Sequence, residues 1–221
     1  MRLETAQVRL HAGFCAGTWT CTQEQALLAR IETLPGLRHV AIGRNLAGSW
    51  GAGDYTLDLQ FDPTASGSPG QGTGLAATLD GMAEVDGVAY RPISCGLRAP
   101  QLRHGIWRTL MFRVRPEAPD WQVRALEQDL LLMPEYMPGI LNWRLARVLS
   151  PGTWTHVWQQ EFASADDLLG EYLMHPFHWG HVDRWFDPEF PEWTVQAISH
   201  AFCPLATSLI ANHNRTEEYA P

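Results

Sequence analysis

The sequence predicts an α+β fold in which one β-α-β-β-α-β plan occurs twice along the chain. Three observations favour this fold. The chain of 221 residues is long for one compact domain and comfortable for two. Strand-like alternation and helix-like spacing follow one another in the same order in both halves. A Pro-Gly turn stands at matching places, Pro35-Gly36 and Pro138-Gly139, so the plan repeats at an offset of about 100 residues.

The first half shows the plan in its simplest form. Alternation of polar and apolar residues predicts its strands, and Leu27 and Ile31 at helical spacing predict its first helix. The expected elements are a strand at 8–14, a helix from Thr22 to Leu34, a hairpin of strands 38–46 and 55–61, a weak helix at 75–83 and a strand near 88–95. The Gly, Ser and Pro residues of 63–74 predict a surface loop.

The second half repeats the plan. The expected strands are 106–114, 142–149, 154–162 and 195–202. Asp120 can cap the first helix, and a capping box of Ser164 and Asp167 begins the second. We expect the second helix to end near His175, because Pro176 disfavours the helical conformation in the residue before it. The last residues, 212–221, predict a frayed tail.

The order β-α-β-β-α-β is that of the ferredoxin-like unit, a four-stranded sheet with both helices on one face. The uncovered face of such a sheet is apolar, so two sheets can bury these faces together. The sequence therefore predicts an α+β chain of two ferredoxin-like domains, packed sheet to sheet as an internal pseudo-dimeric α+β barrel. The expected domains are 1–100 and 101–221.

The charge balance excludes several partners and mechanisms. Acidic residues number 24 and basic residues 16, a formal net charge of −8, so nucleic acid is not an expected partner. Every basic residue is arginine, which excludes a lysine Schiff base, a pyridoxal phosphate linkage and a P-loop lysine. Proton transfer near pH 7 must therefore use His, Asp, Glu, Tyr or Cys.

The sequence contains no segment typical of membrane or secreted proteins and no paired cysteine motif. No apolar run approaches the roughly 20 residues that cross a bilayer, and residues 1–10 do not have the pattern of a secretory signal. We expect a cytoplasmic protein without a membrane partner. The four cysteines form no Cys-x-x-Cys pair, so neither a zinc knuckle nor a thioredoxin-like pair is indicated.

The densest polar cluster lies between residues 171 and 183. Tyr172 precedes and Asp183 follows a set of three histidines, namely His175, His178 and His181. His156 on the strand 154–162 and His104 before the strand 106–114 could join this cluster.

Three interpretations of the cluster stay open at this point. The histidines could be structural, either buried and hydrogen-bonded or exposed at a helix end. They could bind a metal through His175, His178, His181 and Asp183, although the proline after His175 disturbs the helical spacing. They could perform metal-free acid–base catalysis, since an imidazole titrates near neutrality and a tyrosine can donate to a developing oxyanion.

Two segments of the second half resemble the stress-responsive A/B-barrel (Dabb) family. They are Trp154-Thr-His-Val-Trp-Gln-Gln-Glu-Phe162 and Glu171-Tyr-Leu-Met-His-Pro-Phe-His178, separated by the capped helix. The resemblance covers about Gly105 to Leu205, and Met137-Pro-Gly-Ile140 fits the family's turn. The first half resembles the family only in its strand–helix–hairpin order and has no His-Pro-x-His, so it is identified as a degenerate copy in a tandem Dabb chain.

The resemblance implies a fold and a set of roles. Dabb domains are ferredoxin-like units that pair through their sheets. The second half is similar to the polyketide cyclases of the olivetolic acid cyclase type, which use a His base and a Tyr partner without a cofactor. The match implies His178 as the base, Tyr172 as the partner and a more structural role for His175. Those cyclases also carry a first-strand His, whose place is taken here by Ile106, with His104 two residues earlier.

The leading hypothesis is a cofactor-free acid–base enzyme for a small aromatic or polyketide-like carbonyl compound. It would be a cyclase, an aldol or retro-aldol lyase, or an isomerase. His156 and Asp183 are candidates to orient His178. The candidates for the pocket wall, which could equally be core residues, are Trp107, Trp154 and Trp179.

The alternatives belong to other classes of protein. One is a non-enzymatic stress-responsive or ligand-binding Dabb protein with structural histidines. A second is a metal-dependent lyase or oxygenase, and a third is a cofactor-free monooxygenase, because related dimeric α+β barrels host that chemistry. The tandem chain could itself form a homodimer.

Overall fold

The computed structural model describes residues 2–12, 21–62, 74–150 and 152–218, so most of the predicted loop 63–74 lies outside the described residues. The elements of the first half are β1 (Arg2–Leu10), α1 (Cys21–Ile31), β2 (Leu37–Arg44), β3 (Tyr55–Phe61), α2 (Leu75–Thr78) and β4 (Ala83–Leu97). Those of the second half are β5 (Arg103–Val114), α3 (Asp120–Tyr136), β6 (Asn142–Val148), β7 (His156–Phe162), the π-helical segments η1 (Asp167–Tyr172) and η2 (His178–Val182), the 3₁₀ turn η3 (Asp183–Trp185), β8 (Val195–Thr207) and α4 (Leu209–Glu218).

The predicted order of elements is present in both halves, with local corrections. The first strand is not 8–14 but begins at Arg2, because β1 pairs with β3 and β4 from its first residues onward. The weak helix predicted at 75–83 ends at Thr78, since the chain from Ala83 pairs with β1. The predicted tail forms α4 as far as Glu218 instead of fraying at residue 212. The predicted domain division at residue 100 falls between β4 and β5 and stays a prediction.

The strands form a closed sheet. Their order is β2-β3-β1-β4-β6-β7-β5-β8, and every neighbouring pair runs antiparallel. The halves meet where β4 pairs with β6. They meet again where Trp50 and His200 form a β-bridge and where the N–H of Leu46 donates to the carbonyl of Phe202 at 2.9 Å. The predicted internal pseudo-dimeric α+β barrel is therefore confirmed.

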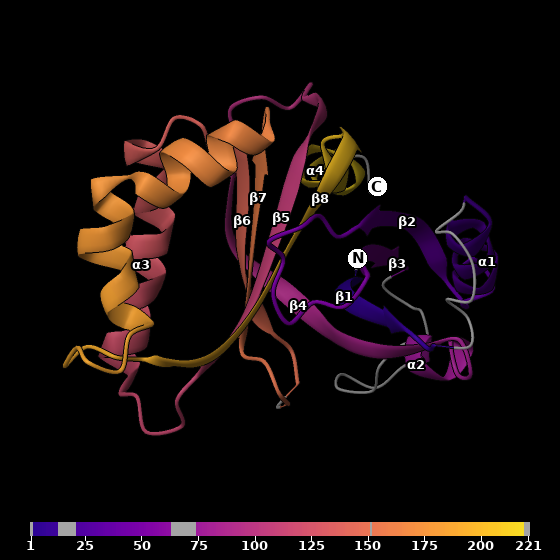
Figure 1. The fold of residues 1–221 in the computed structure, drawn as a ribbon, viewed down its shortest axis with the longest axis horizontal. Coiled ribbons are helices and arrows are strands. Elements are labelled where there is room, and N and C mark those ends of the chain that lie inside the picture. The colour runs from indigo at the N-terminus through magenta and orange to yellow at the C-terminus, as the bar shows by residue number, and fades with distance from the viewer. Residues whose placement is uncertain (1, 13–20, 63–73, 151, 219–221) are drawn as a thin grey trace.

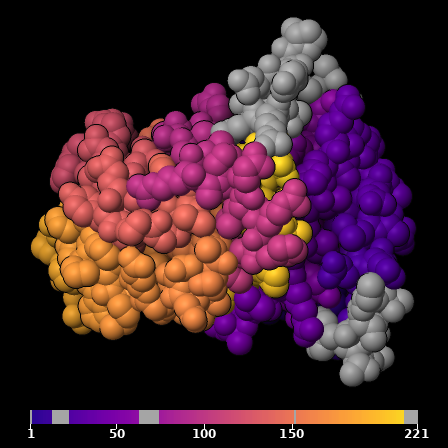
Figure 2. Space-filling model, turned by 90° about the horizontal axis from the view of Figure 1, so that it is seen from above, coloured from indigo at the N-terminus to yellow at the C-terminus, as the bar shows by residue number. Residues whose placement is uncertain are grey.

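The helices cover the outer faces of this barrel. In Figure 1, α3 and the orange helical segment lie outside the second-half strands, and α1 and α2 lie outside the first-half strands. Leu110, Phe112 and Trp158 pack between the second-half strands and their helices. Leu57 and Leu59 pack in the same way in the first half. Figure 2 shows the yellow C-terminal chain between the two halves. Alternate strand residues point the other way, into the barrel.

The prediction that the uncovered sheet faces are apolar is wrong, because a buried polar network occupies the barrel interior. Arg144 of β6 and Asp58 of β3 approach with Nη2 and Oδ2 3.4 Å apart. Tyr90 of β4 donates to Asp58 Oδ2 at 3.1 Å and accepts from Arg144 Nη2 at 2.7 Å. Gln159 of β7 donates to Asp58 Oδ2 at 2.8 Å. His213 of α4 places Nε2 2.8 Å from Asp58 Oδ1 and contacts Arg144 Nη1 with Nδ1. The network thus joins both halves and α4.

The network fixes the protonation states of its members. Burial alone would raise the pKa of Asp58, but His213 and Arg144 outweigh burial and lower it to about 2. Burial lowers the pKa of His213, and the Arg144 cation lowers it further against the pull of Asp58. Asp58 is therefore charged and His213 neutral near pH 7.

A second buried carboxylate holds the start of α4. Glu161 of β7 accepts the backbone N–H groups of Leu209 at 2.7 Å and Ile210 at 3.1 Å. It also accepts the hydroxyl of Ser208 and the amide of Asn142, each at 2.7 Å. A carboxylate at a helix N-terminus satisfies free N–H groups and complements the helix dipole. This contact explains why the C-terminal chain is helical.

We predict that Arg144→Met lowers the free energy of unfolding by about 3–5 kcal/mol, because it leaves Asp58 buried without its cation. The matched control is Arg38→Met, which removes the ion pair between Arg38 and Asp62 at an Arg side chain that is 67% exposed. That pair is worth about 0–1 kcal/mol. Urea denaturation followed by tryptophan fluorescence measures both. Equal losses in the two variants would contradict the assigned role of the network.

Candidate active site

A cavity of about 390 Å³ lies between the second-half sheet and its helical layer. Its walls are mostly apolar and come from β5, β7, β8, α3, η1 and η2. The polar side chains that reach it are Arg108, Tyr172, His178, Asp183 and His200. An apolar cavity with a few convergent polar groups is the usual form of a small-molecule site.

The first half contributes Gly48 to the wall of this cavity. Its φ of +95° is a conformation that favours glycine, and a Cβ atom here would lie 3.1 Å from the ring of Phe202. The loop after β2 therefore reaches the site of the second half at a position that only glycine fits well.

Two π-helical segments carry the catalytic candidates. The predicted capping box is present, because the N–H of Asp167 donates to Ser164 Oγ at 3.2 Å and the Ser164 hydroxyl donates to Asp167 Oδ2 at 2.7 Å. The helix that follows is π-helical, a form frequent at functional sites. Between η1 and η2, His175 Nδ1 accepts the N–H of Phe177 at 3.1 Å, which stabilises the turn at Pro176.

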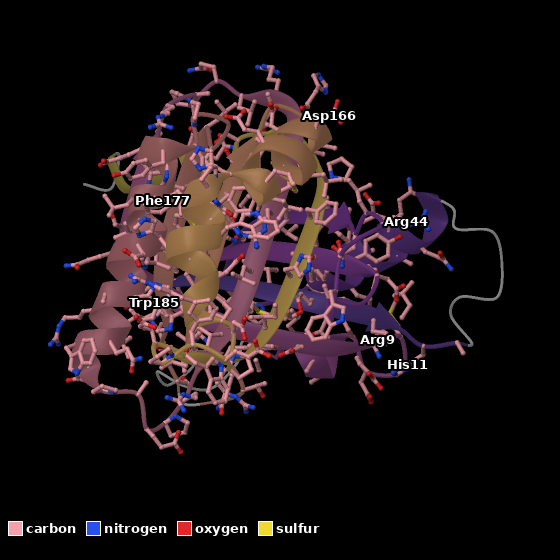
Figure 3. All side chains as sticks on the ribbon, turned by 60° about the vertical axis from the view of Figure 1, so that its left-hand side comes forward. Arg9, His11, Arg44, Asp166, Phe177 and Trp185 are labelled. Carbon is pink, nitrogen blue, oxygen red and sulfur yellow. The ribbon has the colours of Figure 1, made fainter. Side chains whose placement is uncertain are left out.

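Aromatic contacts fix this helical layer on α3. Phe177 stacks on Tyr136 with ring centroids 4.3 Å apart. Trp185 donates its indole N–H to Asp129 at 2.8 Å. Figure 3 shows Phe177 and Trp185 along the layer that covers the sheet. These two anchors lie on either side of His178 in the chain and so restrict where its ring can lie.

His178 lies between a carboxylate and a phenol. Its Nδ1 is 3.0 Å from Asp183 Oδ1, short of ideal hydrogen-bond alignment. Its ring meets Tyr172 edge to face, with centroids 5.0 Å apart. The side chain of Asp183 is 46% exposed and that of His178 only 17%, so the carboxylate lies at the mouth and the imidazole deeper. The structure thus brings together His178, Tyr172 and Asp183.

Tyr172 is a protonated phenol near neutral pH. Burial raises its pKa, and the positive charge of Arg108 offsets only part of that effect. Arg108 Nη1 donates to Gln160 Oε1 at 2.7 Å, which turns the amide nitrogen of Gln160 away from the guanidinium. The hydroxyl of Tyr172, which lines the cavity, can itself act as a hydrogen-bond donor.

His200 reaches the same cavity from β8. Burial lowers its pKa from 6.5 to about 4, and the positive charge of Arg108 adds to the effect. His200 is therefore neutral near pH 7. Its backbone pairs with Trp50, so the strand that carries it also closes the barrel.

His156 does not orient His178. It is buried on β7, where Nε2 lies 3.0 Å from Glu127 Oε1 and the ring stacks on Phe112 at 4.7 Å. Burial would raise the pKa of Glu127, but the hydrogen bonds and charges of His156 and Arg147 lower it to about 2. His156 thus joins Glu127 of α3 and Arg147 of β6 in a polar cluster and lines a separate hollow.

His104 does not reach the cavity either. Residues two apart on a regular strand point to the same face, which would place His104 beside Ile106. His104 is exposed instead, and its φ of +55° departs from the regular strand conformation.

The three tryptophans expected in the wall lie elsewhere. Trp107 is buried with Cys203 on the opposite face of β5. Trp154 donates to both oxygens of Asp86 at 2.9 Å and lines the separate hollow. Trp179 is 60% exposed and donates to the carbonyl of Leu173 at 2.8 Å. The tryptophan in the cavity wall is Trp158, since even-numbered residues of β7 face the helical layer.

The sequence prediction of the site does not include Arg108 and His200, although each interrupts an apolar strand face. Arg108 alternates with Ile106 and Leu110, and His200 alternates with Ile198 and Phe202. A polar residue on the buried face of a strand needs a partner or a ligand. Attention to interrupted alternation would have placed both residues in the site.

The metal-ligand set considered as an alternative does not assemble in the part of the chain that the structure describes. There, no three His, Cys, Asp or Glu side chains converge. His175 holds the turn before η2 and His181 stacks on Phe177 at 4.8 Å, so neither joins His178 and Asp183.

The family comparison covers most of the second half of the chain. Residues 106–197 match the Stress responsive A/B Barrel Domain (Dabb). The resemblance of the second half to Dabb is therefore confirmed, and the tandem arrangement stays a prediction. No curated protein matches the chain. None of the described helices has the length and apolarity that crossing a membrane requires.

Solved structures share the fold over nearly the whole chain. An anthrone oxidase-like protein is 11% identical with a TM-score of 0.59, covering 94% of this chain and 97% of its own. A proposed monooxygenase from Fusobacterium nucleatum is 9% identical with a TM-score of 0.57, and the match covers 94% of this chain and 95% of the monooxygenase. Another from Lactobacillus acidophilus is 10% identical with a TM-score of 0.54, covering 94% and 99%. At these identities the likeness shows the fold alone.

We predict that His200 destabilises the protein in acid. Because its pKa falls from 6.5 to about 4 on folding, its contribution to stability is complete above pH 6.5 and is lost as the pH falls toward 4. His200→Gln should therefore lose less unfolding free energy than the wild type over this window. Urea denaturation at several pH values measures the difference, with the exposed His39→Gln as the control. Parallel pH profiles in the wild type and His200→Gln would refute the prediction.

Proposed function

We propose that this protein is an acid–base enzyme that removes a proton from carbon next to a carbonyl group of a small aromatic or polyketide-like compound. The observation that carries the proposal is the juxtaposition of His178, Asp183 and Tyr172 at one apolar cavity. No step of this chemistry requires a cofactor.

His178 is the proposed base. Asp183 faces Nδ1, which favours the tautomer with hydrogen on Nδ1 and leaves Nε2 as the acceptor. When Nε2 takes the proton, the imidazolium lies beside a carboxylate, and this contact stabilises the charge that has formed. Asp183 is in this scheme a positioning residue that acts through His178.

Tyr172 is the proposed partner of the carbonyl oxygen. Its raised pKa keeps the phenol protonated, so it donates a hydrogen bond to the oxygen as negative charge develops there. The apolar walls exclude water, which strengthens this hydrogen bond. The cavity of about 390 Å³ suits a ligand of one or two rings rather than a polymer.

The carbanion or enolate formed in this way is common to several reactions. Ring closure, aldol or retro-aldol cleavage and isomerisation all begin with it, and we keep cyclase, lyase and isomerase as the proposed reaction types. The side chains in the cavity would catalyse the proton removal that these reactions share. The conformation of the bound substrate would then decide which reaction follows.

A cofactor-free monooxygenase is the second candidate. It is favoured by the printed names of the neighbours, an anthrone oxidase-like protein and two proposed monooxygenases. Such chemistry would use the same deprotonation and then molecular oxygen. Oxygen uptake with anthrone as the probe, measured with an oxygen electrode, separates this candidate from the leading one. Binding of small molecules without turnover is the remaining alternative, and a homodimeric, cytoplasmic protein stays a prediction.

We predict that the protein accelerates hydrogen–deuterium exchange at the methyl group of acetophenone in D₂O. His178→Ala should lower the rate by about 10²-fold or more, the typical worth of a general base. Tyr172→Phe should lower it by about 10²-fold because one oxyanion donor is lost. Proton NMR follows the decay of the methyl signal.

The control for this prediction is His181→Ala, an exposed histidine of η2 that stacks on Phe177 outside the cavity. It should exchange acetophenone at the wild-type rate. Circular dichroism verifies that each variant is folded. Exchange that is as fast in folded His178→Ala as in the wild type would refute the assignment of the base.

A further inference from the structure

Arg108 is a buried cation that forms no ion pair within 4.0 Å with a carboxylate of the described residues. Its side chain lies on β5, is 8% exposed and lines the cavity. Nη1 donates to Gln160 at 2.7 Å, and Cζ lies 5.3 Å from the ring centroid of Tyr172. Among the ion pairs formed by the described residues, none includes Arg108.

Two other arginines of the second-half sheet are balanced by carboxylates. Arg144 has Asp58 at 3.4 Å, and Arg147 has Glu127 at 2.7 Å. A buried charge without a counter-ion is costly, because it loses hydration and gains no attraction in return. Arg108 differs from the two balanced arginines in lining the main cavity, so an anion can reach it there.

The field of this cation acts on the groups around the cavity. The charge of Arg108 lowers the pKa of His200 in addition to burial, and it opposes the rise in the pKa of Tyr172. Both effects are those of a positive charge close to these two side chains.

We propose that the cavity binds a compact apolar molecule that carries one carboxylate, and that Arg108 pairs with this carboxylate. A guanidinium is planar and matches a carboxylate with two parallel hydrogen bonds. One unbalanced cation suits a single negative charge, which favours a carboxylate over a doubly charged phosphate. The apolar part of the ligand then lies against Leu110, Trp158 and Phe202. The proposal rests on the proposed function in using the same cavity, and it adds the class of substrate.

Isothermal titration calorimetry with a matched pair of probes tests this assignment. The probes are 1-naphthoate and 1-naphthamide, which share their shape and differ in charge. The wild-type chain should bind naphthoate about 10- to 100-fold more tightly than naphthamide, the usual worth of a charged hydrogen bond. Arg108→Met should bind both probes with similar affinity, and Arg108→Lys should keep part of the preference for naphthoate.

The control is Arg98→Met. Arg98 also lies 5.3 Å over an aromatic ring, that of Trp143, but on the exposed surface away from the cavity. It should keep the full preference for naphthoate. A wild-type chain that binds the two probes equally or binds neither would overturn the proposal, as would a folded Arg108→Met that still prefers naphthoate. If the Met variant does not fold, the wild-type ratio and the Lys variant decide.

These outcomes are independent of the proposed catalysis. Loss of the naphthoate preference in Arg108→Met supports the carboxylate ligand even if acetophenone exchange does not depend on His178. Exchange that depends on His178, together with equal binding of both probes, sustains the function and rejects the carboxylate.

Discussion

The contact between Asp58 and Arg144 inside the barrel is the interaction on which the rest of the structure depends. It lies between the inward faces of the two half-sheets, and it draws in Tyr90, Gln159 and His213 from three other elements. Such a network stabilises less than an apolar core of the same volume would, but it restricts the arrangements in which every buried charge is satisfied. It therefore specifies how the halves sit against each other, and with them the loop of Gly48 that reaches the second-half cavity.

The outer layer of the second half follows from a different principle. The segment between Asp167 and Trp185 makes few regular α-helical hydrogen bonds, so its position comes from side chains: a capping box at its start, Phe177 on Tyr136 and Trp185 on Asp129. These contacts hold the segment at its start and at two aromatic residues, so the residues between the contacts can lie at the cavity. This is a reasonable way to place an imidazole, a phenol and a carboxylate within reach of one ligand.

The sequence predicted the parts of the fold that depend on local patterns. Strand 55–61 and the capping box of Ser164 are encoded within a few residues, and periodicity or motif finds them. The course of α4 depends on Glu161, a residue of another strand, and no local pattern contains that contact. For the site, the family's motif brought His178 and Tyr172 into view. The prediction of the tryptophans in the cavity wall was wrong because bulk and burial do not show which face of the sheet a residue occupies. Trp107 and Trp158 are both bulky and buried but face opposite sides of the sheet.

Joining the two halves in one chain has an evolutionary consequence. In a barrel made of two identical subunits, each substitution appears twice and must suit both copies, so a buried cation or a left-handed glycine is placed on both sides at once. A barrel whose two halves lie in one chain is free of this constraint. One half can keep Arg108, Tyr172 and His178 around a cavity, while the other lends it Gly48 from a loop and otherwise diverges. The two halves then share the order of their strands and differ in the side chains that line the cavity.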